Sequence, residues 1–228
     1  KNMVEHVDQL VGRIASKVDE LGLSENTLIV FTGDNGTDVP VVTSLNGKLV
    51  AGGKGKANHD SGVRTPFFVT MPGTVQAGKV SDELVDFSDL LPTFCELAKI
   101  DTSENKKLDG VSLLPTLIGK GERKKPWSYL FYSRNDATQP ASSVVVRNAT
   151  HLVYRKGGPD KKIEFFDCSI PYARKLQKPS DLSDDERKVF AELSSVMKRY
   201  DTQYQSDLSK DAVQQWQKKT KAGKKKKK

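Results

Sequence analysis

Hydrophobic residues recur at intervals of three or four along the first twenty residues and then run continuously for a short stretch. The spaced positions are Val4, Val7, Val11, Ile14, Val18 and Leu21. This spacing places them on one stripe of a helix that ends at Gly22, and we expect the stripe to pack against a neighbouring element. The apolar run from Thr27 to Thr32 predicts a short buried strand. A helix that leads into such a strand is typical of an α/β sheet with both faces covered.

The next hundred residues predict one more strand and one more helix. Residues 66–70 form the strand, closed by Met71-Pro72-Gly73. The helix begins near Asp89 and accepts Pro92 in its first turn, where a missing N–H has no intrahelical partner. Its expected buried residues are Phe87, Leu91, Phe94 and Leu97. Residues 101–126 are rich in lysine, glycine and polar residues, which is typical of a linker.

The second half of the chain predicts an antiparallel sheet covered by a helix. Four short apolar runs at close spacing indicate its strands, at Tyr129–Tyr132, Val144–Val146, His151–Tyr154 and Ile163–Phe166. Ser183 and Glu186 form the pattern of a capping box at the start of a helix. The apolar face of this helix consists of Val189, Phe190, Leu193, Met197 and Tyr200.

Charge and cysteine content restrict the function classes only a little. The net charge of +8 comes from eight lysines among residues 218–228, and the rest of the chain balances 29 basic against 29 acidic residues. Such a lysine run predicts a disordered, solvated tail. Two cysteines do not make a disulfide framework. No stretch approaches the about 20 apolar residues that a membrane helix needs.

Two short segments carry candidate chemistry. Asp34-Asn35-Gly36 follows the first predicted strand and offers one anionic and one neutral oxygen, the ligand type that hard cations prefer. By itself this tripeptide more often forms a plain turn. In Gly53-Lys54-Gly55 the flanking glycines allow the backbone to approach an anion while the lysine donates to it. By itself this segment more often forms a flexible connection, and it lacks the spacing of a Walker loop.

The order of these segments resembles the downstream part of the catalytic domain of the sulfatase family. The resemblance covers residues 1–120 well and 140–200 loosely. The matching motifs, in order, are Asp34-Asn-Gly36, Gly53-Lys-Gly55, Gly62-x-Arg64-x-Pro66, Asp89-x-x-Pro-Thr93 and Leu108-Asp-Gly-Val-Ser-Leu-Leu-Pro115. The ordered series is far more specific than any one of them.

The resemblance implies a fold, a reaction and roles for individual residues. The fold would be α/β of the alkaline-phosphatase-like kind, with a partial, parallel-rich sheet followed by a small subdomain of an antiparallel sheet plus a helix. The reaction would be hydrolysis of a sulfate ester by a formylglycine nucleophile, with Ca²⁺, or less readily Mg²⁺, holding the sulfate. Asp34 and Asn35 would bind the metal, and Lys54 would be the catalytic residue that contacts the sulfate.

Two further positions have weaker assignments. His59 lies where the family often has an aromatic residue, so it is a candidate substrate contact, although a loop histidine is more often a solvated surface residue. For Arg64 we expect a structural ion pair or hydrogen bonds to the loop backbone. His6 and His151 have no expected role. Asn148-Ala-Thr150 is a glycosylation sequon, which has meaning only in a secreted eukaryotic protein.

The family's nucleophile motif, Cys-x-Pro-x-Arg, does not occur in this sequence. Cys95 is followed by Glu-Leu-Ala-Lys, and Cys168 by Ser-Ile-Pro-Tyr. We therefore expect the chain to be the C-terminal part of a longer enzyme, inactive on its own, with the formylglycine upstream. Its expected parts are residues 1–120 from the catalytic domain, 121–205 as a small α+β subdomain, and 206–228 as a lysine-rich tail.

The resemblance leaves the substrate and the oligomeric state open. It implies a sulfated small molecule or carbohydrate, no specific nucleic acid, and a secreted or periplasmic location. One alternative is a phosphodiesterase or phosphonate hydrolase of the same superfamily, since these share the fold and part of the metal site. A second alternative is a non-catalytic module that binds polyanions through the lysine tail.

Overall fold

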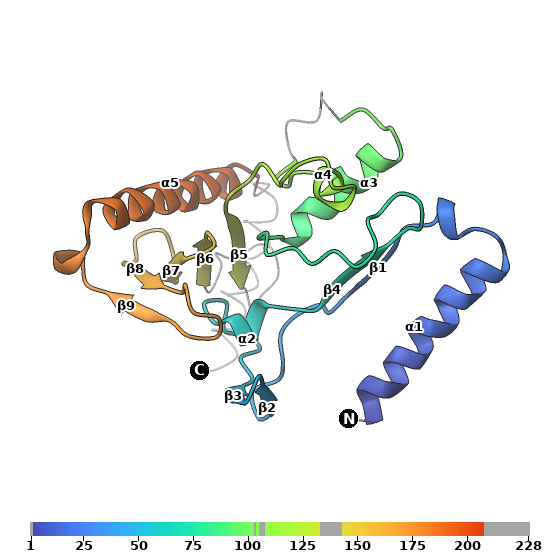
Figure 1. Ribbon diagram of the computed structural model, residues 1–228. Coiled ribbons are helices and arrows are strands. Elements are labelled where there is room, and N and C mark those ends of the chain that lie inside the picture. Colours follow the sequence, from blue (N-terminus) through green and yellow to red (C-terminus); the bar gives the residue numbers. More distant parts are fainter. Residues whose placement is uncertain (1, 103, 105–107, 133–142, 208–228) are drawn as a thin grey trace, which may run out of the picture. The chain divides into compact units, whose positions relative to one another are not determined.

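The computed structural model describes residues 2–102, 104, 108–132 and 143–207 (Figure 1). The chain divides into two compact units. The first unit contains residues 1–34 and 65–125, and the second contains residues 35–64 and 126–228. The predicted lysine-rich tail lies outside the described residues, apart from the helical residues that precede 208.

The first unit begins with the predicted helix and strand. Helix α1 (Asn2–Glu20) is followed by Gly22, whose φ of +68° suits a residue without a Cβ. A 3₁₀ turn, η1 (Ser24–Asn26), leads into β1 (Ile29–Thr32), which pairs with β4 (Phe67–Thr70). After these come η2 (Phe87–Asp89), α3 (Leu90–Leu97) and α4 (Leu114–Leu117).

The strand pairs of the described residues are all antiparallel, so the expectation of a parallel-rich sheet is wrong for this part of the chain. Strand β1 runs against β4, with Ile29 opposite Thr70. A parallel pair needs a long crossover, usually a helix. Between β1 and β4 the chain forms only the hairpin of β2 (Val42–Leu45) and β3 (Lys48–Ala51) and the short helix α2 (Asp60–Val63).

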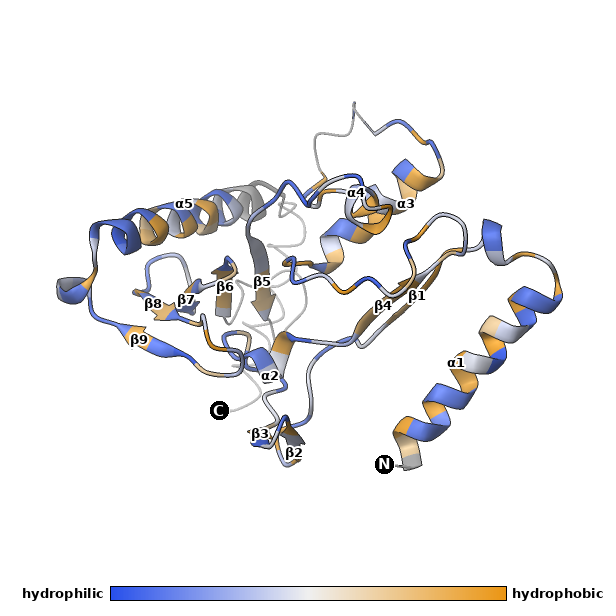
Figure 2. Ribbon diagram, in the orientation of Figure 1, coloured by the Kyte–Doolittle hydropathy of each residue, from blue (hydrophilic) through white to orange (hydrophobic). Residues whose placement is uncertain are grey.

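The apolar faces of α1 and α3 are more exposed than the sequence predicts. Figure 2 shows hydrophobic positions recurring along α1, and Ile14 is 60% exposed. In α3 and the turn before it, Phe87, Leu91 and Phe94 are exposed, which corrects their predicted burial. The buried positions of this segment are instead Asp89, Pro92 and Thr93. The residues that α3 and the turn before it bury in the protein interior are therefore largely polar.

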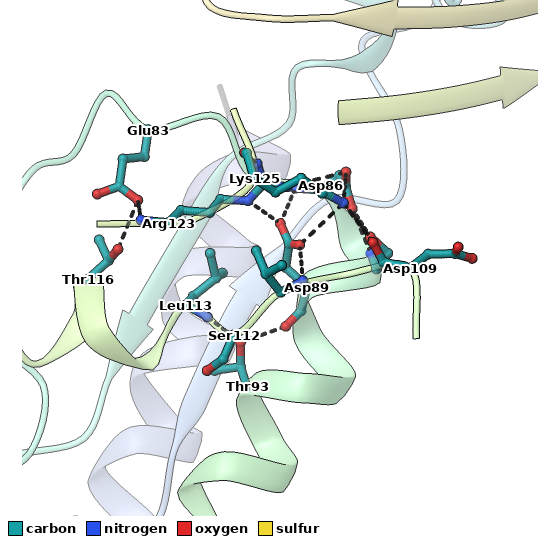
Figure 3. Close-up of polar contacts among 12 residues, drawn as sticks. Glu83, Asp86, Asp89, Thr93, Asp109, Ser112, Leu113, Thr116, Arg123 and Lys125 are labelled. Carbon is teal, nitrogen blue, oxygen red and sulfur yellow. Dashed lines mark hydrogen bonds and ion pairs between the residues drawn. The ribbon is translucent and has the colours of Figure 1, made fainter. Parts of the chain in front are cut away.

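A buried cluster of charged side chains explains this polar contact (Figure 3). Asp89 accepts hydrogen bonds from Arg123 Nε at 2.8 Å and from the backbone N–H of Val111 at 2.9 Å. Lys125 Nζ lies 3.2 Å from a carboxylate oxygen of Asp86. Thr93 accepts from the N–H of Leu113 at 2.8 Å. These contacts fasten the start of α3 to residues 109–125, so the linker prediction is wrong for this part of 101–126.

The second unit contains a five-stranded antiparallel sheet in the order of the sequence. Its strands are β5 (Ser128–Tyr132), β6 (Ser143–Arg147), β7 (His151–Lys156), β8 (Ile163–Asp167) and β9 (Lys175–Gln177). The first four confirm the predicted strands, and β9 was not predicted.

Helix α5 (Asp184–Asp207), which follows the turn η3 (Pro179–Asp181), covers one face of this sheet. Its capping box is confirmed, because the Ser183 N–H donates to Glu186 at 2.8 Å and the Glu186 N–H donates back at 3.3 Å. Val144, Val146, Val153, Phe165, Leu193 and Met197 form the core between them. A second core cluster contains Ala57 together with Val145, Leu152, Phe166 and Cys168. The loop that carries Ala57 is thereby fixed to the sheet.

Among the described residues, no helix is both long enough and apolar enough to cross a membrane. Both cysteines are unpaired, as expected: Cys168 is buried and Cys95 is half-buried. Burial raises the pKa of the Cys168 thiol above its usual value. Cys168 is therefore a poor nucleophile in this fold.

Candidate functional site

Residues 52–62 form a compact loop that requires its glycines. The backbone N–H of Lys56 donates to the carbonyl of Gly53 at 2.8 Å, and that of Gly62 donates to His59 at 2.9 Å. Gly52, Gly53 and Gly62 are buried. A Cβ on Gly53 would lie 2.5 Å from Ser61 Oγ, and one on Gly62 would lie 2.4 Å from the carbonyl oxygen of Gly53. Larger residues would force this loop open.

The segment after β1 is hydrogen-bonded to this loop. The Gly36 N–H donates to the carbonyl of Gly62 at 3.0 Å, and the Lys54 N–H donates to the carbonyl of Thr37 at 2.9 Å. A Cβ on Gly36 would lie 2.1 Å from the Ser61 carbonyl oxygen. Gly36 and Thr37 are therefore bonded through their backbones to the loop that carries Lys54.

Asp34 and Asn35 lie in a bend that begins two residues after β1, and both are exposed. Their oxygens are of the type that Ca²⁺ and Mg²⁺ prefer, so the donor set fits a hard cation. Within the part of the chain that the structure describes, no group of three or more His, Cys, Asp or Glu side chains could hold a metal ion. Two protein ligands are well short of the about six to eight oxygens that Ca²⁺ takes.

Lys54 is exposed on the turn between Gly53 and Gly55. None of the ion pairs found among the described residues involves its ammonium group. Gly55 has a φ of +83°, a conformation that lets the chain turn immediately after the lysine. The side chain is thus presented to solvent by a rigid backbone and is available to an anion.

His59 is half-buried and lines a pocket in the second unit. Burial lowers the pKa of His59 below its usual value of 6.5; the positive charges of Arg174 and Lys56 lower it further, and only Asp60 opposes them. His59 is therefore a neutral imidazole at pH 7. The location fits a substrate contact better than a solvated surface residue, and the role itself stays a prediction.

The structure corrects the expectation for Arg64. Its guanidinium carbon lies 5.7 Å from the centre of the Tyr172 ring, and its side chain forms none of the ion pairs found among the described residues. The backbone N–H of Arg64, not its side chain, bonds the loop, at 2.7 Å from the Asp60 carbonyl. The ion pair of this loop is instead formed by Asp60 and Arg147, with 2.7 Å between Arg147 Nη1 and the Asp60 carboxylate. Tyr172 is 108 residues after Arg64 in the sequence, so the local motif around Arg64 could not predict this contact.

The other two histidines lie outside the glycine loop. His6 is exposed on α1. His151 stacks on Phe165 with 5.1 Å between ring centres, and its Nδ1 lies 2.9 Å from Thr150 Oγ1. The sequon residue Asn148 lies in the β6–β7 turn, where its side-chain oxygen accepts from the N–H of His151 at 2.7 Å. These contacts give His151 and Asn148 structural roles in the β6–β7 turn and the adjoining sheet.

Comparison with known proteins decides the family. The sequence model named Sulfatase matches residues 1–100, and the one named N-sulphoglucosamine sulphohydrolase, C-terminal, matches residues 55–169. The chain belongs to the sulfatase family. The first match contains Lys54 and the whole glycine loop, whereas the second begins at Gly55, directly after the lysine.

The relatives with curated names are sulfatases. Human steryl-sulfatase is 38% identical over 138 residues, which cover 58% of this chain and 23% of the relative. The N-acetylgalactosamine-6-sulfatase of Canis lupus familiaris is 34% identical over 136 residues, covering 58% of this chain and 25% of the relative. The chain thus spans about a quarter of the length of these sulfatases.

Solved structures agree on the fold. A protein whose structure was solved in complex with its substrate, D-glucosamine-2-N,6-O-disulfate, aligns with a TM-score of 0.63 at 19% identity, covering 90% of this chain and 40% of that one. At this identity the likeness shows the fold alone. It confirms an α/β fold of the alkaline-phosphatase-like kind, although the strand pairs of this chain are antiparallel.

Sequence reasoning missed most of the pocket around His59. Tyr172 and Arg174 line it from the segment between β8 and β9, and residues 45–51 line it from the β2–β3 hairpin. The hairpin had a signal, since Asn46-Gly47 is the preferred pair of a two-residue turn, and both residues have positive φ. Tyr172 and Arg174 carry no such signal.

Proposed function

We propose that this chain supplies part of the active site of an enzyme that hydrolyses sulfate esters. Lys54 would donate to a sulfate oxygen and offset the charge that develops on the leaving oxygen. Asp34 and Asn35 would contribute one anionic and one neutral oxygen to a divalent cation. His59 would line the substrate pocket.

One observation carries the proposal. The backbone bonds from Gly36 to Gly62 and from Lys54 to Thr37 hold a candidate cation segment against a candidate anion loop. A cation and a lysine that bind the same sulfate need this proximity, whereas a turn and a flexible connection do not. Membership of the sulfatase family supports the assignment of the anion as a sulfate ester.

The metal would be Ca²⁺, with Mg²⁺ less suitable, because a flexible set of oxygen ligands suits the larger ion. When bound, it would neutralise the sulfate and orient it. The nucleophile would be a formylglycine outside these 228 residues, since neither Cys95 nor Cys168 lies in Cys-x-Pro-x-Arg. Residues 1–120 would then belong to a larger catalytic domain, with residues 121–205 as its small C-terminal subdomain.

The substrate class would be a sulfated small molecule or a sulfated carbohydrate. The names of the relatives include both a steryl and an N-acetylgalactosamine sulfatase, and the substrate of one structural neighbour is a disulfated glucosamine. The resemblance to the sulfatase family would place the enzyme in a secreted or periplasmic location.

A metal titration tests the proposal. In the complete enzyme, Asp34→Ala should raise the Ca²⁺ concentration needed for half-maximal hydrolysis of an aryl sulfate by about tenfold or more. Asp38→Ala is the matched control, because this exposed carboxylate bonds only the neighbouring Val39 N–H among the contacts described. Equal Ca²⁺ requirements for the two variants would refute the metal assignment.

A further inference from the structure

The second unit contains an open pocket of about 490 Å³ that the proposed chemistry does not use fully. It is lined by the β2–β3 hairpin, by residues 58–61, and by residues 168–174 with Leu152. All of these residues belong to the same compact unit. A volume of this size is within the range of small-molecule sites, about 300–1,000 Å³. Lys54 is not among the lining residues.

The charged side chains of this pocket are predominantly cationic. Lys48 and Arg174 line it together with the neutral imidazole of His59, and the one acidic residue among the described lining residues is Asp60. The Asp60 carboxylate is already engaged, because it accepts from Arg147 Nη1 at 2.7 Å and from the Tyr172 N–H at 3.0 Å. The pocket therefore presents positive charge that Asp60 does not neutralise.

Arg174 is the more informative of the two cations. Its guanidinium lies over the Phe166 ring, 5.0 Å from its centre, and donates to the carbonyl of Asn58 at 3.4 Å. It forms none of the ion pairs found among the described residues. Partial burial lowers the pKa of Arg174 below its usual value. The Glu164 carboxylate acts on Arg174 electrostatically without forming an ion pair with it among the described residues. A partly desolvated guanidinium without a direct ion pair is stabilised by an incoming anion.

The backbone beside Arg174 is held in an unfavourable conformation. Tyr172 has a φ of +62°, which residues other than glycine seldom adopt. The hydrogen bond from its N–H to the buried Asp60 carboxylate holds it there. Strained residues of this kind concentrate at ligand-binding sites, where they keep the site preorganised. Asp60 thus fixes the segment that carries Arg174 before any ligand binds.

We propose that this pocket binds a second anionic group of the substrate, a sulfate or carboxylate on a sugar, through Arg174, His59 and Lys48. The anion is separate from the sulfate assigned to Lys54, so the preferred substrate carries at least two negative groups. This inference rests on the proposed function for the identity of the ligand as a sulfated sugar. The presence of an anion site depends only on the pocket.

Calorimetric titration of the 228-residue chain without metal tests the inference. Every protein in the test carries Lys54→Ala, so that binding of a sulfate by Lys54 does not contribute. D-Glucosamine-2-N,6-O-disulfate should bind, and glucosamine should not. Arg174→Gln should weaken binding of the disulfate by about tenfold, the size of one charge-assisted hydrogen bond. Arg187→Gln is the matched control, because Arg187 is an exposed arginine of α5 outside the pocket, and it should bind like the parent.

A second variant and two further ligands complete the test. Lys48→Gln, at the exposed first position of β3, should also weaken binding, so it serves as a second test if Arg174→Gln fails to fold. Glucosamine 6-sulfate and glucuronic acid distinguish sulfate from carboxylate as the recognised group. If Arg174→Gln and Lys48→Gln bind the disulfate as tightly as Arg187→Gln, or if glucosamine binds as tightly as the disulfate, the inference is wrong. Because the assay needs no turnover, failure of the proposed hydrolysis would leave this result intact.

Discussion

The carboxylate of Asp89 accepts a hydrogen bond from Arg123 Nε at 2.8 Å, with the two side chains 0% and 2% exposed. The Asp-x-x-Pro-Thr motif therefore has a structural explanation in this chain. Its aspartate binds Arg123 and the Val111 N–H, and its threonine receives the Leu113 N–H. The motif anchors the residues that follow α3.

Removing Arg123 should destabilise the first unit strongly. Arg123→Met leaves the Asp89 carboxylate buried without its main partner, which costs about 3–5 kcal/mol. Hydrogen exchange of the α3 amides should report this loss of stability. The control is Lys161→Met, which breaks the exposed pair with Asp160 and should leave exchange unchanged. Protection of α3 equal to that of the control would contradict the structural explanation of the motif.

Gly36→Ala should separate the segment after β1 from the glycine loop. The new Cβ would lie 2.1 Å from the Ser61 carbonyl oxygen, so the backbone must move. Loosening of this packing should make trypsin cleavage after Lys54 and Lys56 about tenfold faster. Gly12→Ala is the control, since a Cβ there meets nothing within 4 Å and should not change cleavage in the loop. Equal cleavage rates would show that the loop does not depend on Gly36.

The pKa of His59 should depend on Arg174. Burial, Arg174 and Lys56 hold this pKa below 6.5, so the folded state binds the proton less readily than the unfolded state does. His59 therefore reduces stability as the pH falls from 6.5 through the lowered pKa. In an NMR titration, Arg174→Gln should raise the pKa of His59, and Arg187→Gln should not. An unchanged pKa in Arg174→Gln would place the two side chains too far apart to share an anion.

The sequence predicts the local elements of this chain better than their partners. Helix α1, β1, the β5–β8 strands and the Ser183–Glu186 capping box follow from periodicity and capping chemistry, which act over a few residues. The exposure of Phe94 and the antiparallel pairing of β1 with β4 depend on what lies beside them in space. Apolar periodicity says that a face could be buried, but it does not identify what covers it.

The residues of the candidate site also form two groups, those that the sequence predicts and those that it does not. Lys54, Asp34 and Asn35 are recognisable because glycines and turn residues surround them in a fixed order. Arg174 and Tyr172 are not, because Tyr172 bonds Asp60 across 112 residues and the neighbouring sequence is unremarkable in composition. The polar residues of 108–125 resembled a linker because the buried carboxylates that need them lie elsewhere in the sequence.

The most direct test of the account is the turnover number of the complete enzyme on an aryl sulfate, with Lys54→Ala compared with Lys56→Ala. Both lysines are exposed residues of the same loop. Lys54→Ala should lower kcat by about a hundredfold or more, the cost of a lost oxyanion donor, with an unchanged melting temperature. Lys56→Ala should keep kcat near that of the wild type. Equal kcat values for the two variants would contradict the claim that Lys54 acts on the sulfate.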